Sequence, residues 1–168
     1  MFSIGLISQE QQERRTVISV GLDPAVLIDN NRVGGGNLDF TGRIGVEDNI
    51  FKAQISIEYF NVINYFATSG QAGVILPLYY KGLYGTLMPE LNLINRWGIN
   101  DGRKTADNHS SQLGIGMNAG LQYEFNFGGF IEWNANLKSR PDLDYHYQSF
   151  DETSQTVFNT TFSIGYKF

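Results

Sequence analysis

The sequence predicts an all-β fold in which eight antiparallel strands follow one another in an up-and-down meander and close into a barrel. Three observations predict it: segments where apolar and polar residues alternate, links that alternate between short and long, and small residues concentrated on the polar faces. Period-two alternation is the pattern of an extended strand with one apolar and one polar face. With 168 residues, the chain has the size of a single domain.

Composition agrees with this fold class and excludes several functions. Nineteen glycines, four prolines and 14% aromatic residues fit an all-β chain with many turns. The sequence has no cysteine, which excludes disulfides, thiol catalysis and cysteine-based zinc sites. A formal net charge of -5 argues against a nucleic-acid partner, because such proteins usually carry a basic stripe. No run of eighteen apolar residues predicts a transmembrane helix, but a transmembrane barrel dilutes its apolar residues with interior ones.

The N-terminus begins with a short apolar segment, Met1 to Ser8, followed by a polar one. It reads either as the remnant of a secretory signal or as an unstructured or added end, since it lacks a basic region and is short. We therefore assign residues 1–15 to an N-terminal segment, a signal remnant or periplasmic extension, and residues 16–168 to one transmembrane barrel domain.

The first four predicted strands are Ser19–Val26, Leu38–Glu47, Lys52–Phe60 and Ala72–Tyr80. In the first three, aliphatic or aromatic residues alternate with charged, polar or small ones, as in Lys52–Phe60, where Ile55 and Ile57 alternate with Ser56 and Glu58. The fourth segment is apolar on both faces, so its pattern is the weakest of the eight.

The last four predicted strands are Thr86–Asn95, Leu113–Phe125, Ile131–Lys138 and Thr156–Phe168. The final segment is the clearest, because large apolar residues occupy nearly every second position up to Phe168. No segment shows a helical period. Strands of roughly nine to thirteen residues are long enough to cross a bilayer at a steep tilt.

The links between these strands alternate in length. Short turns of hairpin-forming residues are predicted at Asp48–Asn49, Lys81–Gly82 and Asn126–Gly129. Longer polar links are predicted at Asp29–Asn37, Asn61–Gln71, Gly98–Gln112 and Ser139–Gln155. In a meander, alternate links lie at the same end, so the short turns share one end with both chain termini. This sorting is typical of transmembrane barrels.

The polar faces are predicted to point into the barrel. An eight-stranded barrel is just wide enough inside for its side chains, so the face rich in glycine and serine fits there better than the bulky apolar face. Charges of both signs on the polar faces can pair across the interior. The predicted interior charges are Asp39, Arg43, Glu47, Lys52, Glu58, Glu90, Glu124, Glu132, Lys138 and Lys167. Reversed faces would instead indicate a soluble ligand-binding barrel.

Aromatic residues gather near both ends of the predicted strands, as expected at the two interfaces of a membrane. They are Tyr79, Tyr80, Tyr123, Phe125, Tyr166 and Phe168 at the turn end, and Tyr59, Trp97 and Phe158 toward the loop end. Pro77 and Pro89 disturb the pattern, because each removes a hydrogen-bond donor from a strand ladder. We expect a bulge there, or a strand boundary nearer the membrane edge.

Over most of its length the chain resembles the small OmpA- and OmpX-like outer-membrane β-barrel proteins. The shared features are the strand count, the sorted links, the interior charges and the ending Ile164–Phe168. The resemblance implies a bacterial outer membrane with its lipid and lipopolysaccharide as surroundings, periplasmic turns and termini, and extracellular loops. It also implies that Tyr166 and Phe168 form part of the signal read by the barrel-assembly machinery.

Some barrels of this kind deacylate lipid A with a His-x-Ser pair and a glutamate. His109 and Ser111 reproduce the spacing of the pair. The nearest following acid, Glu124, has the opposite parity and lies on the order of 45 Å away along the same strand. We therefore predict no catalytic residue.

Two other features suggest ligands but do not match known sites. His146 lies among Asp142, Asp144 and Asp151, a spacing that fits no established set of metal ligands. The glycine triplet at 34–36 is followed by no Lys-Ser/Thr pair, unlike a phosphate-binding loop. We predict no metal and no cofactor.

The leading interpretation is a non-enzymatic outer-membrane protein that presents its long loops for adhesion, complex assembly or envelope integrity, with another envelope protein as a possible partner. Loops carry function on such scaffolds, and exposed aromatic and basic residues are the best contact candidates. These candidates are Trp97, Arg103, Lys104, Tyr145, His146, Tyr147 and Phe150. The alternatives are a narrow channel for ions or small solutes, and a soluble ligand-binding barrel.

Overall fold

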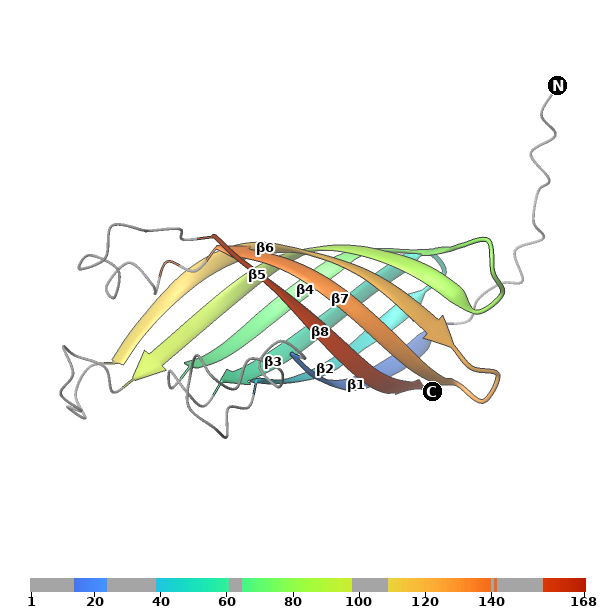
Figure 1. The fold of residues 1–168 in the computed structure, drawn as a ribbon, viewed down its shortest axis with the longest axis horizontal. Helices are drawn as coiled ribbons and strands as arrows, with labels where there is room; N and C mark the ends of the chain where they lie inside the picture. The colour runs from blue at the N-terminus through green and yellow to red at the C-terminus, as the bar shows by residue number, and fades with distance from the viewer. Residues whose placement is uncertain (1–13, 24–38, 61–64, 98–108, 140, 142–155) are drawn as a thin grey trace, which may run out of the picture.

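The computed structural model is a closed barrel of eight strands (Figure 1). It describes residues 14–23, 39–60, 65–97, 109–139, 141 and 156–168; the side chains at 60, 65, 96, 97, 109 and 110 are outside that description. The strands are β1 Arg15–Leu22, β2 Asp39–Asp48, β3 Phe51–Phe60, β4 Tyr65–Pro77, β5 Leu83–Trp97, β6 His109–Glu124, β7 Gly129–Ser139 and β8 Thr156–Lys167.

Each strand pairs antiparallel with the next in sequence, and β8 pairs with β1 to close the barrel. The predicted eight-stranded meander is therefore confirmed. No helix in the described part of the chain is long and apolar enough to cross a membrane.

The three short links lie together at one end, which we call the turn end (Figure 1). Asn49, Gly82 and Gly128 there have positive φ angles of 55°, 80° and 87°, a conformation that glycine adopts without strain. The backbone N–H groups of Glu124 and Lys167 donate to the carbonyls of Gly82 and Gly128 at 2.7 and 3.0 Å. The turns are therefore bonded to the neighbouring strands.

The start of β1 and the end of β8 also lie at the turn end. Thr16 and Phe168 exchange two backbone hydrogen bonds, at 2.9 and 3.3 Å. β1 begins at Arg15, next to the predicted boundary between an N-terminal segment 1–15 and a barrel 16–168. The opposite end, where the remaining links leave the strands, is the loop end.

Two strand predictions were displaced. β1 lies at Arg15–Leu22 instead of Ser19–Val26, and β4 lies at Tyr65–Pro77 instead of Ala72–Tyr80. The long link predicted at Asn61–Gln71 is wrong, because only residues 61–64 separate β3 from β4. After Phe66, the outward positions in the first half of β4 hold the small residues Thr68 and Gly70, so pairing with β3 defines this part of the strand instead.

The two prolines behave differently. Pro77 is the last residue of β4, the strand boundary that was expected as one possibility. Pro89 lies inside β5, and there the β4–β5 ladder skips from Gln71↔Glu90 to Val74↔Leu87. The register is the same on both sides, so the ladder is interrupted without a bulge. This register places Pro89, which lacks a backbone donor, opposite Ala72.

Candidate functional site

The outer wall of the barrel is apolar. Ile115, Trp133 and Phe162 on this wall are 67%, 55% and 48% exposed. Among the described residues, thirty large hydrophobic side chains are exposed and only six hydrophobic side chains are buried. Soluble proteins place most such side chains inside, so the usual arrangement is inverted.

Exposed aromatic rings line the turn end of this wall. Tyr79 and Tyr80 pack edge to face with ring centroids 5.2 Å apart, and Tyr166 and Phe168 do so at 5.0 Å. A third group joins Tyr123, Phe125 and Phe127 through contacts of 5.1 and 5.5 Å. Toward the loop end, Tyr59 and Phe158 are exposed, while the side chain of Trp97 lies outside the described residues.

The interior is polar and ionic. Twenty-three polar or charged side chains are buried among the residues that the structure describes. Of the ten predicted interior charges, the structure buries Arg43, Glu47, Lys52, Glu58, Glu90, Glu132, Lys138 and Lys167. Asp39 and Glu124 are half-buried instead.

One cluster of these charges is centred on Lys52, nearer the turn end. Its Nζ lies 3.1 Å from Glu132 Oε1 and 3.5 Å from Glu47 Oε1, and it donates to Gln122 Oε1 at 3.0 Å. Lys52 on β3 and Glu132 on β7 belong to strands that are not neighbours. The cluster therefore spans the interior, and its members are almost completely buried.

The cluster continues to the turn-end mouth. Lys167 Nζ lies 2.5 Å from Glu47 Oε2 and 2.8 Å from Glu124 Oε2. Arg15 Nη1 lies 2.5 Å from Glu124 Oε1. Arg15 was not predicted as an interior residue because it was assigned to the N-terminal segment.

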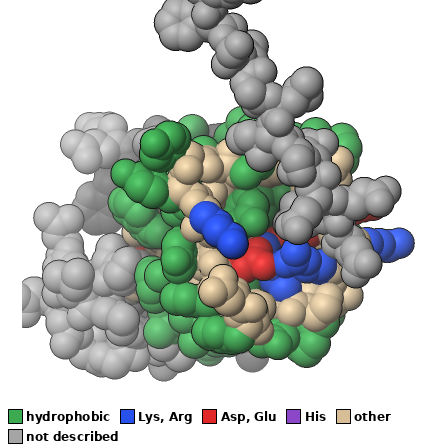
Figure 2. All heavy atoms as spheres, turned by 90° about the vertical axis from the view of Figure 1, so that its right-hand side faces the viewer, with side chains coloured by type: hydrophobic (Ala, Val, Ile, Leu, Met, Phe, Trp, Pro, Cys, Tyr) green, Lys and Arg blue, Asp and Glu red, His purple; other side chains and the backbone are tan. Residues whose placement is uncertain are grey.

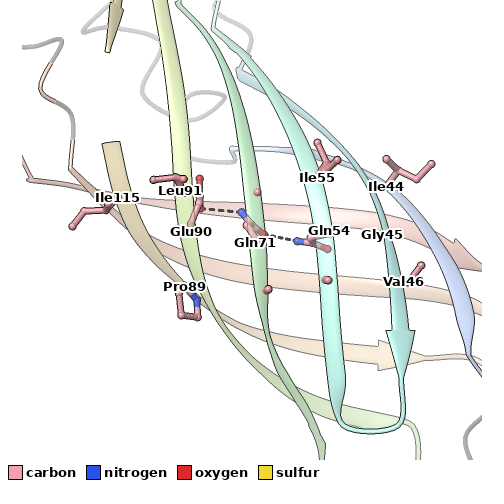
Figure 3. Close-up of a pocket in the computed structure, with 13 residues that line it drawn as sticks. Ile44, Gly45, Val46, Gln54, Ile55, Gln71, Pro89, Glu90, Leu91 and Ile115 are labelled. Atoms are coloured by element: carbon pink, nitrogen blue, oxygen red, sulfur yellow. Dashed lines mark hydrogen bonds between the residues drawn. The ribbon is translucent and has the colours of Figure 1, made fainter. Parts of the chain in front are cut away.

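A second cluster lies nearer the loop end. Lys138 Nζ lies 2.5 Å from Glu58 Oε2 and 3.6 Å from Glu90 Oε1. Two glutamines extend it, since Gln54 donates to Gln71 at 2.5 Å and Gln71 donates to Glu90 at 2.9 Å. Figure 3 shows this row crossing β3, β4 and β5.

Five basic and five acidic side chains form the ion pairs and hydrogen bonds of these two clusters and their surroundings. The basic residues are Arg15, Arg43, Lys52, Lys138 and Lys167, and the acidic residues are Glu47, Glu58, Glu90, Glu124 and Glu132. Arg43 Nη1 donates to Ser163 Oγ at 2.6 Å. Pairing between opposite charges offsets part of the cost of burying them, and Asp23 is a further buried acid in the described part of the chain.

Uncharged polar residues were missing from the predicted site but fill much of the interior. Asn118 Nδ2 donates to Asn136 at 2.5 Å, and Asn136 Nδ2 donates to Thr161 Oγ1 at 3.2 Å. These residues share the inward parity of the charges, so strand parity alone was the signal that could have found them. Met88 and Phe130, two buried hydrophobic side chains, fill the remaining space between polar ones.

A hollow of about 600 Å³ lies on the outer wall, where the β4–β5 ladder is interrupted (Figure 3). Small residues, Ala53, Gly70 and Ala72, line it together with Pro89. Its shape follows from the absence of large outward side chains at these positions.

The described residues form neither the deacylase-like site nor the metal site considered in the sequence analysis. Ser111 is exposed and donates to Asn95 at 2.7 Å, whereas Glu124, at the other end of β6, contacts Arg15 and Lys167. No group of three or more His, Cys, Asp or Glu side chains in the described part of the chain is arranged to hold a metal ion. The side chain of His109 lies outside this part.

The loop residues predicted to make contacts are not described by the structure. Apart from Trp97, whose backbone ends β5, they belong to the ranges that it leaves out. They are Arg103, Lys104, Tyr145, His146, Tyr147 and Phe150. Their role therefore stays a prediction.

Comparison with solved structures finds small outer-membrane barrels. The N-terminal barrel domain of Pseudomonas aeruginosa OprF is 16% identical, with a TM-score of 0.62 over 94% of this chain and 98% of that one. Yersinia pestis outer-membrane protein Ail is 15% identical, with a TM-score of 0.58 over 93% and 100%. P. aeruginosa outer-membrane protein H (OprH) is 15% identical, with a TM-score of 0.56 over 93% and 100%.

No protein-family model matches the sequence, and no curated protein does either. At these identities the likeness concerns the fold. The chain has the fold of the small outer-membrane β-barrels, and the resemblance predicted from its sequence is confirmed at that level.

Proposed function

We propose that this chain is a non-enzymatic integral protein of the bacterial outer membrane, which presents the loop-end links at the cell surface for adhesion, complex assembly or envelope integrity. The observation that carries the proposal is the inverted distribution of side chains: in the described part of the chain, thirty large hydrophobic side chains are exposed and twenty-three polar or charged ones are buried. A wall of this kind is stable in hydrocarbon and aggregates in water.

Strand pairing supports the same environment. In lipid, every backbone donor and acceptor must be satisfied within the protein, which a closed barrel achieves because it has no edge strand. The pairing of β8 with β1 removes both edges of this sheet. A soluble ligand-binding barrel, the alternative weighed from the sequence, would need its apolar face inside.

The proposed orientation places the turn end in the periplasm and the loop end outside. It is supported by the sorting of the links, since residues 49–50, 78–82 and 125–128 join strands at the turn end. The links 24–38, 98–108 and 140–155 leave the loop end, and residues 61–64 form a shorter fourth link there.

The proposed contacts follow from this orientation. Tyr145, His146, Tyr147, Phe150 and Trp97 are the aromatic and histidine candidates for a protein partner. Arg103 and Lys104 are the candidates for lipopolysaccharide phosphates. Tyr166 and Phe168 lie at the turn end, where they are proposed to be read by the barrel-assembly machinery.

A wide channel is disfavoured by the interior. Lys52, Gln122 and Glu132 reach across it and are 1%, 0% and 1% exposed. An eight-stranded barrel is just wide enough inside for its side chains. No described feature favours conduction over display of loops.

Two cysteine variants test the location and orientation, because the natural sequence contains no cysteine. Gly35→Cys lies in the link between β1 and β2, and Asn126→Cys lies in the turn between β6 and β7. On intact cells, a membrane-impermeant maleimide should label the Gly35→Cys variant and should reach the Asn126→Cys variant only after permeabilisation. The reverse pattern would contradict the orientation, and release of the protein without detergent would contradict the membrane location.

A further inference from the structure

A pocket of about 700 Å³ opens at the turn end of the barrel. Arg14, Arg15, Lys81 and Lys167 contribute four basic side chains to its lining, whereas Glu124 contributes the acidic one. Viewed from this end, Lys and Arg side chains lie within a ring of hydrophobic ones, next to acidic side chains (Figure 2). This concentration of positive charge contrasts with the net charge of -5 of the whole chain.

The inner part of the pocket is electrically compensated. Lys167 contacts both Glu47 and Glu124, at 2.5 and 2.8 Å, and Arg15 contacts Glu124 at 2.5 Å. Two basic and two acidic side chains therefore neutralise one another at the base of the pocket. These ion pairs also join four strands at the turn end, because their members come from β1, β2, β6 and β8.

The outer part is not compensated. Arg14 and Lys81 are exposed, and neither makes an ion pair or hydrogen bond with any residue in the part of the chain that the structure describes. Arg14 precedes β1, and Lys81 lies in the turn between β4 and β5. Two positive charges thus line the same opening, and no described residue pairs with either of them.

Aromatic side chains also line the pocket. Tyr123, Phe125 and Phe168 are exposed there, and they belong to the rings at the turn end of the outer wall. A molecule that fills this pocket meets both cations and aromatic rings. A small hydrophilic anion would leave the aromatic rings unused.

We propose that this pocket binds the phosphate of an anionic phospholipid, with the headgroup between Arg14 and Lys81 and the upper acyl chains against Tyr123, Phe125 and Phe168. The inference rests on the proposed membrane location, which sets the aromatic rings at the level of the headgroups. Phosphate oxygens accept charge-assisted hydrogen bonds from both guanidinium and ammonium groups. Each basic residue near an anionic lipid surface raises the affinity for that surface roughly fivefold.

The test uses the full chain in nanodiscs of phosphatidylcholine with increasing fractions of phosphatidylglycerol. The amide resonances of Gly82 and Gly128, two turn residues that line the pocket, report occupancy. The natural sequence should show saturable shifts. The double variant Arg14→Gln/Lys81→Gln should need about 30-fold more phosphatidylglycerol, and each single variant about fivefold more.

The matched control is Arg32→Gln/Arg140→Gln, which removes the same charge from the links 24–38 and 140–155 at the other end. It should leave the shifts unchanged. An equal loss in this control would overturn the proposal, because attraction would then depend on net charge. A change of less than twofold in the Arg14→Gln/Lys81→Gln variant would overturn it as well.

Inorganic phosphate and glycerol phosphate, added to phosphatidylcholine nanodiscs, separate a lipid from a free anion. They should shift Gly82 and Gly128 only weakly; saturation at the same concentration as the lipid would overturn the assignment to a phospholipid. Heat-modifiable migration of every variant is measured in parallel. A chain that never inserts would refute the proposed function, whereas an inserted chain without saturable shifts refutes this inference alone.

Discussion

Replacing Lys52 with methionine removes the cation at the centre of the turn-end cluster and leaves buried carboxylates behind. Glu47 retains Lys167 at 2.5 Å, but Glu132, which is 1% exposed, loses the only basic side chain within 4.0 Å among the described residues. Removing one partner of a buried ion pair destabilises a protein by about 3–5 kcal/mol. We expect a loss of this size in the free energy of unfolding.

The double variant Lys52→Met/Glu132→Leu should recover most of this loss. Apolar side chains of similar volume often replace a buried ion pair at little cost, and the remaining deficit is the bond to Gln122, worth about 1 kcal/mol. The double variant should therefore be roughly 2–4 kcal/mol more stable than Lys52→Met alone. Lys81→Met, at an exposed position, is the control and should change stability by less than about 0.5 kcal/mol.

Urea unfolding in lipid vesicles, followed by tryptophan fluorescence in both directions, measures these differences. Trp133 on the outer wall reports the transfer from lipid to water. If Lys52→Met costs less than about 1 kcal/mol, or if the double variant is no more stable than Lys52→Met, water reaches the interior charges. Either result would refute the description of a buried, ion-paired interior and would favour the channel.

Three further predictions test packing, the outer wall and conduction. Gly45→Ala should lower the free energy of unfolding by about 1–3 kcal/mol, because a Cβ there would meet the backbone of Ala53 and Gln54. Gly70→Ala should be nearly neutral, because nothing lies within 4 Å of a Cβ at that position. Equal effects of the two substitutions in urea unfolding would contradict the packing. Leu91→Arg in the middle of the outer wall should lower the free energy of unfolding by about 2–4 kcal/mol, and Tyr79→Arg at the turn end by about 0–1 kcal/mol. The reverse order would contradict a bilayer centred on the middle of the wall. In planar bilayers the reconstituted chain should show no steady openings; steady openings that disappear in an Arg43→Leu variant would establish a lumen path.

The strands with complete alternation were the ones that the sequence predicted well. Thr156–Phe168 corresponds to β8 because its outward positions hold large apolar residues almost without interruption. The first half of β4 was missed for the opposite reason, since outward Thr68 and Gly70 look like loop residues. There the strand is defined by its neighbour β3, and pairing between strands does not appear in a local pattern.

The direction of the interior side chains was also predictable, but their partners were not. Parity places Lys52 and Glu132 inside, yet they are 80 residues apart in the chain. Whether they meet depends on the tilt and stagger of the closed barrel. Arg15 was overlooked because β1 begins earlier than its apolar pattern suggests, and Pro89 could not be placed because a ladder can lose two pairs and keep its register.

Site-directed spin labels provide the most direct test of which medium surrounds the wall, since the chain has no natural cysteine. Labels on Ile115→Cys and Phe162→Cys should collide frequently with oxygen, which partitions into lipid, and rarely with a water-soluble nickel chelate. A label on Asn118→Cys, at a position that is 0% exposed, should be reached by neither. Free access of the nickel chelate to positions 115 and 162 in vesicles would contradict a lipid-facing wall.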